Sequence, residues 1–267
     1  MPELPEVETI KLELEQVIKG LKFTGVLVNN PKIIREISVE KFKKGLIGAT
    51  IKNIIRRAKV LILELSNGKS LVIHLRMTGQ LVYPGDGLKS RISFRFNNGQ
   101  LLDFNDQRLF AQVHLRDEWR KMKFIQSLGP EPFDLSLEKF SQMLKNRKTK
   151  IKPLLMDQAF VSGIGNLYAS EILFRSKINP LRPAQSLSGK EINTLFIETK
   201  KVLRDAIRYG GSSVDDYVRL SGKPGGYAAH HKVYGKAGKP CPACGTPIKR
   251  IALGGRGTFF CPKCQKD

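Results

Sequence analysis

The sequence predicts an α+β protein with a strand-rich N-terminal part, a helical part and a small C-terminal module that carries every cysteine. Short apolar or alternating runs bounded by turn residues fill residues 23–114, which is typical of antiparallel strands. Helical periodicity dominates residues 135–207, and two pairs of cysteines follow near the C-terminal end. A chain of 267 residues is long enough for two domains and a metal module.

The first predicted element is a helix that opens the chain. It begins near Pro5 and ends near Gly20, because proline suits a first helical turn and glycine a C-terminal cap. Four apolar residues between them fall on one face at helical spacing: Val7, Ile10, Leu14 and Val17.

The strand-rich part is predicted to be an antiparallel β-sandwich or barrel. Asn67-Gly68 and Asn98-Gly99 are turn pairs of the kind that join the strands of a hairpin. A linker, LGPEPFD at residues 128–134, separates this part from the helices. The runs that predict strands are GVLVNN, IKNIIRR, VLILEL, LVIHLRM, RISFRF and LLDFND.

The helical part contains LEKFSQMLKN and KEINTLFIETKKVLRDAIR. A stretch rich in glycine and serine, GGSSVDDYVRLSGKPGG, connects it to the cysteine module. We therefore divide the chain into three domains with boundaries at residues 1–130, 131–225 and 226–267.

The charge of the chain points to a polyanionic partner. Lysine and arginine number 46 against 24 acidic residues, which gives a formal net charge of +22. Phosphate binding with counterion release explains such a charge, although RNA-binding and membrane-surface proteins can be equally basic. The sequence has no apolar run long enough to span a bilayer and no basic, apolar leader, so we expect a cytoplasmic protein.

The four cysteines predict a zinc site. Cys241 and Cys244 form one CxxC pair and Cys261 and Cys264 a second, with sixteen residues between the pairs. This spacing is typical of a tetrahedral four-cysteine zinc site, and it argues against a disulfide framework or a single redox CxxC. Because four thiolates leave no open position, we expect one structural zinc ion.

The N-terminus carries the first candidate for chemistry. If Met1 is removed, Pro2 becomes a secondary amine with a pKa of about 7.7–8.0, low enough for nucleophilic attack near neutral pH. Such an amine attacks an aldehyde-like carbon and forms an iminium. Glu3 lies beside it as a candidate general acid. Taken alone, Pro2, Glu3 and Glu6 are explained equally well as the start of a helix.

Lys59 is a second candidate, because it begins an apolar strand directly after Arg56 and Arg57. A lysine at this position is usually an exposed charge at a strand end. Two neighbouring arginines would instead lower its pKa and suit it to proton transfer.

The segment GIGN at residues 163–166 is a candidate phosphate-binding turn. Paired glycines allow close approach of a phosphate, the following helix offers N–H donors, and Asn166 adds a side-chain amide. A plain helix–helix turn is the alternative. A basic cluster just upstream favours contact with a DNA backbone over a solvated face; its members are Lys145, Arg147, Lys148, Lys150 and Lys152.

Met77, Arg108 and Phe110 are candidates for side chains that enter a base stack. Met77 lies in HLRMTG, and the other two lie in NDQRLFA. Apolar wedges of this kind unstack duplex DNA, and an arginine can bond to the unpaired base. The alternative is that Met77 and Phe110 are ordinary core residues.

Motifs spread over essentially the whole chain resemble the formamidopyrimidine-DNA glycosylase family of bacterial base-excision-repair enzymes. They are PELPEVE, RRAK, HLRMTG, MDQ with GIGNLYASEILF, GGSS with GKPGGY, VYGKAGKPC and GRGTFFCPKCQ. The resemblance implies a β-sandwich with a leading helix, a helix–two-turn–helix domain and a zinc finger. It implies removal of 8-oxoguanine and formamidopyrimidines from duplex DNA, followed by β,δ-elimination through a Schiff base on Pro2. We expect the enzyme to act as a monomer.

The same resemblance implies roles for individual residues. Pro2 attacks C1′, Glu3 takes part in proton transfer, and Lys59 is required for base excision and strand cleavage. Arg256 binds phosphate and assists the second elimination. The residues implied to contact DNA are Asn166, Arg108, Arg147, Arg91, Met77 and Phe110.

Two stretches depart from the family pattern. A histidine pair is common where this chain has Lys89-Ser90-Arg91, so positive charge is retained without the histidines. The motif D-x-R-[RK]-F-G is altered in residues 106–111, DQRLFA, which changes the second basic residue and the glycine.

Two other functions fit part of the sequence. An endonuclease VIII-like glycosylase for oxidised pyrimidines shares Pro2 and Glu3, but often begins PEGPE, where this chain has Leu4. A zinc-ribbon protein that binds nucleic acid without catalysis fits the charge and cysteines. It gives no reason for Pro2, Glu3 and Lys59 together.

Overall fold

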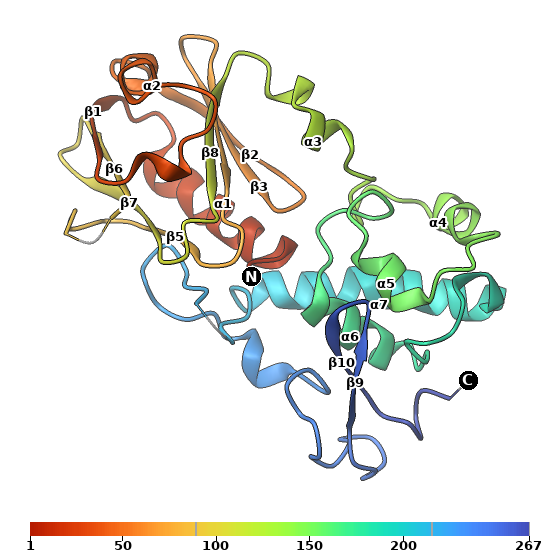
Figure 1. Ribbon diagram of the computed structural model, residues 1–267. Coiled ribbons are helices and arrows are strands. Elements are labelled where there is room, and N and C mark those ends of the chain that lie inside the picture. The colour runs from red at the N-terminus through yellow and green to blue at the C-terminus, as the bar shows by residue number, and fades with distance from the viewer. Residues whose placement is uncertain (89, 215, 267) are drawn as a thin grey trace. The chain divides into compact units, whose positions relative to one another are not determined.

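The computed structural model describes residues 1–88, 90–214 and 216–266 (Figure 1). The chain forms two compact units. One combines Met1–Gln126 with Ala206–Ala228, and the other combines Ser127–Asp205 with Ala229–Asp267. Among the described residues, no helix is long and apolar enough to cross a membrane.

The first unit contains two four-stranded sheets in which all neighbouring strands are antiparallel (Figure 1). One sheet has the order β1 (Phe23–Val28), β6 (Ile92–Phe96), β7 (Leu101–Asp106), β5 (Gly79–Val82). The other has the order β2 (Ile51–Arg57), β3 (Val60–Leu65), β4 (Ser70–His74), β8 (Gln112–Arg116).

Apolar side chains from both sheets form one hydrophobic core. Phe23 and Phe94 come from the first sheet, and Leu63 and Ile73 from the second, and all four are almost completely buried. Because two separate sheets share this core, the β-sandwich alternative is confirmed over the barrel.

Helix α1 (Leu4–Ile18) packs against β2 and β3 and contributes to the same core. Val7, Ile10 and Leu14 are buried as predicted, and Gly20 follows the helix with a left-handed φ of 85°. The prediction for Val17 was wrong, since it is 40% exposed and Ile18 is buried instead. A step of four residues after Leu14 continues the buried stripe, whereas a step of three leaves it.

All six predicted runs contain strands, and both predicted turn pairs join them. Gly68 and Gly99 each adopt φ of 81°, which a residue without a Cβ does readily. Strands β5 and β8 were not among the predicted runs. Short helices complete the unit: η1 (Pro31–Ile33), α2 (Val39–Leu46), η2 (Trp119–Lys121) and α3 (Lys123–Gln126).

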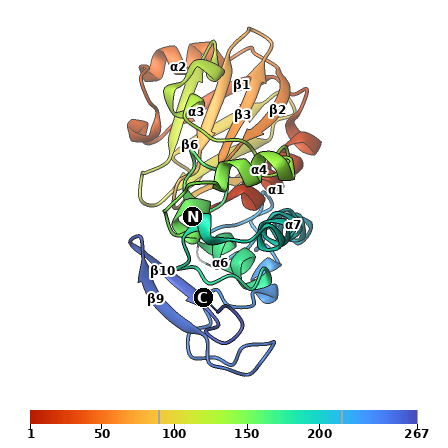
Figure 2. The ribbon, with the colours of Figure 1, turned by 90° about the vertical axis from the view of Figure 1, so that its right-hand side faces the viewer.

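The second unit is mainly helical and ends in a β-hairpin. Its helices are α4 (Leu137–Leu144), α5 (Ile151–Met156), α6 (Asn166–Arg175), η3 (Ala184–Ser186) and most of α7 (Gly189–Arg208). Helix η4 (Tyr227–His230) lies where the chain passes from the first unit to the second. The hairpin consists of β9 (Lys249–Leu253) and β10 (Arg256–Phe260), whose strands lie side by side in Figure 2.

Candidate active site and zinc module

The N-terminal residues are buried rather than solvent-exposed. Pro2 and Glu3 are both buried, and only Met1 before them is exposed. The Glu6 carboxylate accepts hydrogen bonds from the backbone N of Glu3 at 2.8 Å and of Ser212 at 2.9 Å. Glu6 therefore fixes the start of α1 against a loop some two hundred positions further along the chain.

Gly211 allows this loop to pass close to Glu6. Its φ is 77°, and a Cβ there would lie 3.0 Å from the Glu6 side chain and 2.9 Å from the Tyr217 ring. A side chain at this position is excluded both by the backbone conformation and by the lack of space.

Lys59 is buried, with only 6% of its surface exposed. Burial lowers the pKa of its ammonium group, and the negative charges of Glu3 and Glu6 partly oppose this effect. The structure thus brings Lys59, Glu3 and Glu6 into one electrostatic group, and Glu3 is the chain neighbour of Pro2. A buried lysine with a lowered pKa next to carboxylates is the kind of group that transfers protons.

Burial, rather than the charge of the neighbouring arginines, is the main cause of the lowered pKa of Lys59. Arg56 pairs with the Glu8 carboxylate at 2.5 Å and donates to the carbonyl of Ala58 at 3.0 Å. The sequence-based explanation from adjacent positive charge is therefore replaced by burial.

The three predicted wedge residues lie in two loops of the first unit. Met77 precedes β5 and is 38% exposed, while Phe110 lies between β7 and β8 and is 50% exposed. The Arg108 guanidinium lies 4.6 Å from the centre of the Phe110 ring, within the range of a cation–π contact. All three side chains are accessible from solvent.

Arg91 lies directly before β6, and its Nε donates to the Asp106 carbonyl at 3.0 Å. Ser90 beside it is buried and its hydroxyl lies 2.6 Å from that of Ser93. Lys89, the third residue of this altered stretch, lies outside the described residues.

His74 is a half-buried histidine that the sequence-based site did not include. Its Nδ1 accepts a hydrogen bond from the Arg76 backbone N at 3.1 Å. Burial, followed by the charges of Arg76, Lys59 and His114, lowers the pKa of His74 to about 3. It is therefore neutral near pH 7, as an accepting Nδ1 requires.

In the second unit, Asn166 starts helix α6, and Lys152 binds the side chain of Asn166. Lys152 is 1% exposed, and its Nζ donates to Asn166 Oδ1 at 2.5 Å and to Thr258 Oγ1 at 2.8 Å. Lys152 thus joins α5, α6 and β10, unlike the exposed Arg147 of the same basic cluster. Its place inside the apolar segment IKPLLM was the signal for burial.

Glu171 is another buried residue that sequence reasoning missed. Its carboxylate accepts backbone hydrogen bonds from Lys232, Val233 and Tyr234 at 2.8–2.9 Å. Burial raises its pKa even though these three bonds favour the charged form. An acid within the apolar helix NLYASEILF was the available signal.

The four predicted zinc ligands come together. Their sulfur atoms all lie within 4.8 Å of one another, and two of the pairs are 3.5 and 3.9 Å apart. Four sulfurs bound at about 2.3 Å around a tetrahedral zinc ion would stand about 3.8 Å apart. The geometry therefore fits one structural zinc ion held by Cys241, Cys244, Cys261 and Cys264. Arg256 begins β10 of the same module and is exposed.

Three family descriptions match successive parts of the chain. Residues 1–113 match the formamidopyrimidine-DNA glycosylase N-terminal domain, and residues 128–218 match the H2TH domain of the same enzymes. Residues 238–266 match the zinc finger found in FPG and IleRS. Together they define a class of protein, a DNA-repair glycosylase with a helix–two-turn–helix domain and a zinc finger.

Full-length relatives agree with this class. Formamidopyrimidine-DNA glycosylase of Pelotomaculum thermopropionicum is 41% identical, covering 100% of this chain and 99% of its own. That of Herpetosiphon aurantiacus is 43% identical over 99% of this chain and 100% of its own. The chain belongs to the formamidopyrimidine-DNA glycosylase family.

Solved structures show the same similarity. The MutM (FPG) protein of Thermus thermophilus has a TM-score of 0.89 at 37% identity, covering 99% of this chain and 98% of that one. Lactococcus lactis Fpg in complex with abasic-site DNA has a TM-score of 0.91 at 36% identity, covering 99% and 100%. This membership excludes a zinc-ribbon binder without catalysis.

Proposed function

We propose that the chain removes oxidised purines, 8-oxoguanine and formamidopyrimidines, from duplex DNA and cleaves the strand at the resulting site. The observation that carries the proposal is Lys59, buried with a lowered pKa in the field of Glu3 and Glu6 beside Pro2. A protein that only binds DNA gains nothing from a buried lysine at this place.

The proposed chemistry starts at the nitrogen of Pro2. With Met1 attached this nitrogen is an amide, so removal of Met1 is required before it can act as an amine. The amine attacks C1′ and forms the N–C1′ bond, while the glycosidic bond breaks and the base leaves with a proton. The nitrogen gives up its own proton, and its lone pair then expels the ring oxygen O4′, which takes a proton from Glu3, so the C1′–O4′ bond breaks and an iminium forms. The iminium then withdraws electrons from the sugar, so loss of the C2′ proton breaks the 3′ C–O bond.

A second elimination breaks the 5′ C–O bond, and water hydrolyses the iminium to free Pro2. Glu3 and Lys59 are the proposed proton-transfer groups in these steps, since both are buried, Glu3 follows Pro2 in the chain, and the charge of Glu3 acts on Lys59. Arg256 is the proposed phosphate contact for the second elimination. No step needs a redox cofactor, and zinc serves the finger only.

DNA binding is proposed to use all three domains, residues 1–130, 131–225 and 226–267. A flipped nucleotide costs a few kcal/mol, which phosphate contacts offset. Asn166, Arg147 and Arg91 are the proposed backbone contacts. The exposure of Met77 and Phe110 supports insertion into the duplex, because a core role would bury them. A monomeric, cytoplasmic enzyme on nucleoid DNA remains our prediction.

Borohydride trapping tests the proposal. Incubation with a duplex that carries 8-oxoguanine should give a covalent protein–DNA adduct, and Pro2→Gly should nearly abolish it. A chain that keeps Met1 should form none. Normal cleavage by the Met1-retaining chain would show that Pro2 is not the nucleophile. An adduct with oxidised pyrimidines alone would favour the endonuclease VIII-like function.

Lys59→Met is the second arm of this test. The change removes the proton-transfer group, so excision of 8-oxoguanine should fall by roughly 10²- to 10⁴-fold. Lys69→Met is the control, because Lys69 is a surface lysine paired with Asp117 at 2.5 Å. Equal activity of the two variants would contradict the role of Lys59.

A further inference from the structure

The two loops that carry Met77, Arg108 and Phe110 each contain a strained residue. Arg76 adopts φ of 54° and Leu109 adopts φ of 56°, both in the left-handed region. This conformation is unfavourable for a residue with a Cβ, and it persists only where surrounding contacts enforce it. Each strained residue is a direct neighbour of a predicted wedge residue.

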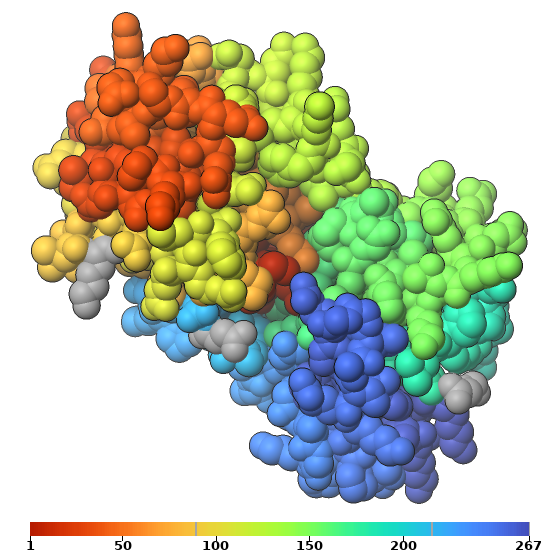
Figure 3. Space-filling view, in the orientation of Figure 1, coloured from red at the N-terminus to blue at the C-terminus, as the bar shows by residue number. Residues whose placement is uncertain are grey.

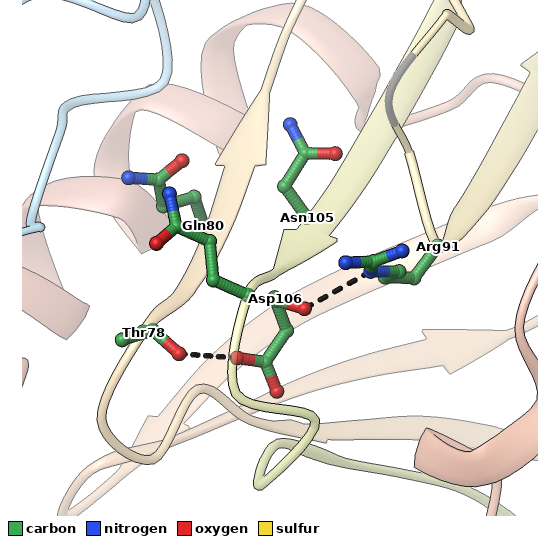
Figure 4. A pocket seen from close by; sticks show the side chains of 6 residues that line it. Thr78, Gln80, Arg91, Asn105 and Asp106 are labelled. Atoms are coloured by element: carbon green, nitrogen blue, oxygen red, sulfur yellow. Dashed lines mark hydrogen bonds between the residues drawn. The ribbon is translucent and has the colours of Figure 1, made fainter.

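One carboxylate binds both loops. Asp106 ends β7 and is 1% exposed. Its Oδ1 accepts from the Thr78 hydroxyl in the first loop, and its Oδ2 accepts from the Ala111 backbone N in the second loop at 2.8 Å. Figure 4 shows the bond between Thr78 and Asp106.

Thr78 and Asp106 also bind the backbone N–H of Arg108. It lies 3.2 Å from Thr78 Oγ1 and 3.3 Å from Asp106 Oδ1. The first loop is closed behind Thr78 by a bond from Gly79 N to the Leu75 carbonyl at 3.0 Å. A Cβ on Gly79 would lie 2.5 Å from that carbonyl oxygen, so only glycine fits.

We propose that Asp106 is a positioning residue that locks these two loops into one rigid unit through Thr78, so that Met77, Arg108 and Phe110 enter the duplex together. This inference rests on the proposed function, because it assumes that the three side chains enter the base stack. Asp106 is buried behind the loops and acts only through the residues that it holds.

An amide cannot replace the carboxylate of Asp106. Asp106 is bound by donors on both of its oxygens, and an ionised carboxylate is an acceptor on both sides. In Asp106→Asn one of the two positions becomes an NH₂ donor. With the NH₂ in the place of Oδ2, it faces the Ala111 backbone N–H and leaves it unpaired; with the NH₂ in the place of Oδ1, the acceptor that the Thr78 hydroxyl and the Arg108 N–H share is lost.

Asp103→Asn is the matched control. Asp103 lies three residues earlier in β7, is 3% exposed, and accepts from the Ser93 hydroxyl at 2.5 Å and the Gly87 backbone N at 2.8 Å. Asp103 is therefore an equally buried and hydrogen-bonded carboxylate, but these contacts do not bind the loop of Met77 or the loop of Arg108 and Phe110. A variant with Thr78→Val removes the link between the loops while leaving Asp106 intact.

The experiment uses the full chain with two readouts. Hydrogen exchange reports the amides of residues 106–111 in the free protein. Stopped-flow fluorescence of 2-aminopurine, placed beside a tetrahydrofuran abasic analogue in duplex DNA, reports insertion without any catalysis. Asp106→Asn and Thr78→Val should speed exchange at Arg108 and slow insertion by roughly 10- to 100-fold. Asp103→Asn should leave both readouts as in the wild type.

Three outcomes would overturn the proposal. One is normal insertion by Asp106→Asn, whether or not its loops exchange faster. Another is an equal loss in Asp103→Asn, which would show a general effect of stability. The third is a wild-type protein that gives no 2-aminopurine signal, since the three side chains would then not enter the stack. Borohydride trapping reports the proposed glycosylase function separately from all three.

Discussion

At the scale of single residues, burial decides the chemistry of the candidate site. Lys59 has a lowered pKa because it is removed from water, and Glu3 and Glu6 supply the charges that moderate the shift. The sequence placed Lys59 after two arginines but could not show that Arg56 is paired with Glu8. Glu6 likewise looked like a first-turn acid, and its bond to Ser212 depends on contact between distant parts of the chain.

His74 predicts a dependence of stability on pH. Its folded pKa of about 3 lies below the ordinary value of 6.5, so between these values the unfolded chain binds a proton that the folded chain does not. The free energy of unfolding should therefore fall as pH drops from 6.5 toward 3, by at most about 1.4 kcal/mol per pH unit for this group.

His74→Asn tests this dependence by urea unfolding at several pH values. The asparagine oxygen keeps an acceptor for the Arg76 backbone N, but the group no longer titrates. The variant should lose stability less steeply below pH 6.5 than the wild type. A residual slope is expected from His231, whose pKa burial lowers to about 4. An unchanged slope would show that His74 does not contribute.

Truncation of the wedge residues should separate activity from stability. Met77→Ala and Phe110→Ala remove exposed side chains, so the melting temperature should change little while excision of 8-oxoguanine slows. Phe104→Ala is the contrasting variant, because Phe104 is fully buried and its loss should cost roughly 3–5 kcal/mol. A large fall in stability for Met77→Ala or Phe110→Ala, with normal excision at low temperature, would assign them to the core.

At the scale of elements, hydrophobic periodicity predicted the helix and strands that bury one face against the core. The six runs that contain strands have alternating or β-branched patterns, and the helix α1 has three of its four predicted core positions. Strand β5 has only four residues, and β8 contains Gln112, His114 and Arg116 on one face. Four residues are too few for a periodic signal in β5, whose place is set by pairing with β7. Strand β8 does alternate, because Val113 and Leu115 lie in the core between these polar residues, so its pattern was a signal that the list of runs left out.

The zinc module is the element whose stability depends on a ligand. Its hairpin β9–β10 reaches the surface in dark blue in Figure 3, and beyond its strand pairing it is held by Lys152 through Thr258 and by the cysteines. A small module of this kind has little apolar core, so metal binding supplies much of its folding free energy.

Loss of zinc should therefore displace Arg256 and weaken DNA binding. Metal analysis should find one zinc ion per chain, and Cys261→Ser or a strong chelator should reduce it to none. We expect binding of lesion DNA, measured by fluorescence anisotropy, to weaken, while the sheets of the first unit keep their circular dichroism signal. Full activity of the zinc-free protein would contradict a structural role for the metal.

At the scale of the whole molecule, sequence motifs predicted the family better than composition did. Charge alone left DNA, RNA and membrane surfaces open, and the cysteine spacing alone fitted a simple binder. The buried polar links, Lys152 to Asn166 and Glu171 to the segment 232–234, could not be predicted, because they join parts of the chain that no local pattern relates.

The net charge of +22 predicts a steep dependence of DNA affinity on salt. Each phosphate neutralised on duplex DNA should contribute about −0.9 to the slope of log K against log salt, and single-stranded nucleic acid about −0.7. The basic cluster of residues 145–152 is not uniform in this respect. Lys145, Arg147 and Lys148 are exposed and able to meet phosphates, whereas Lys152 is buried in hydrogen bonds to Asn166 and Thr258.

We therefore expect two variants within this cluster to give different results when each is titrated with undamaged duplex DNA at several salt concentrations. Arg147→Gln should reduce the magnitude of the slope by about one unit while leaving the melting temperature unchanged. Lys152→Met should instead lower stability and disturb Asn166, because it removes bonds that join α5, α6 and β10. A flat salt response of the wild type would show that the positive charge serves a partner other than duplex DNA.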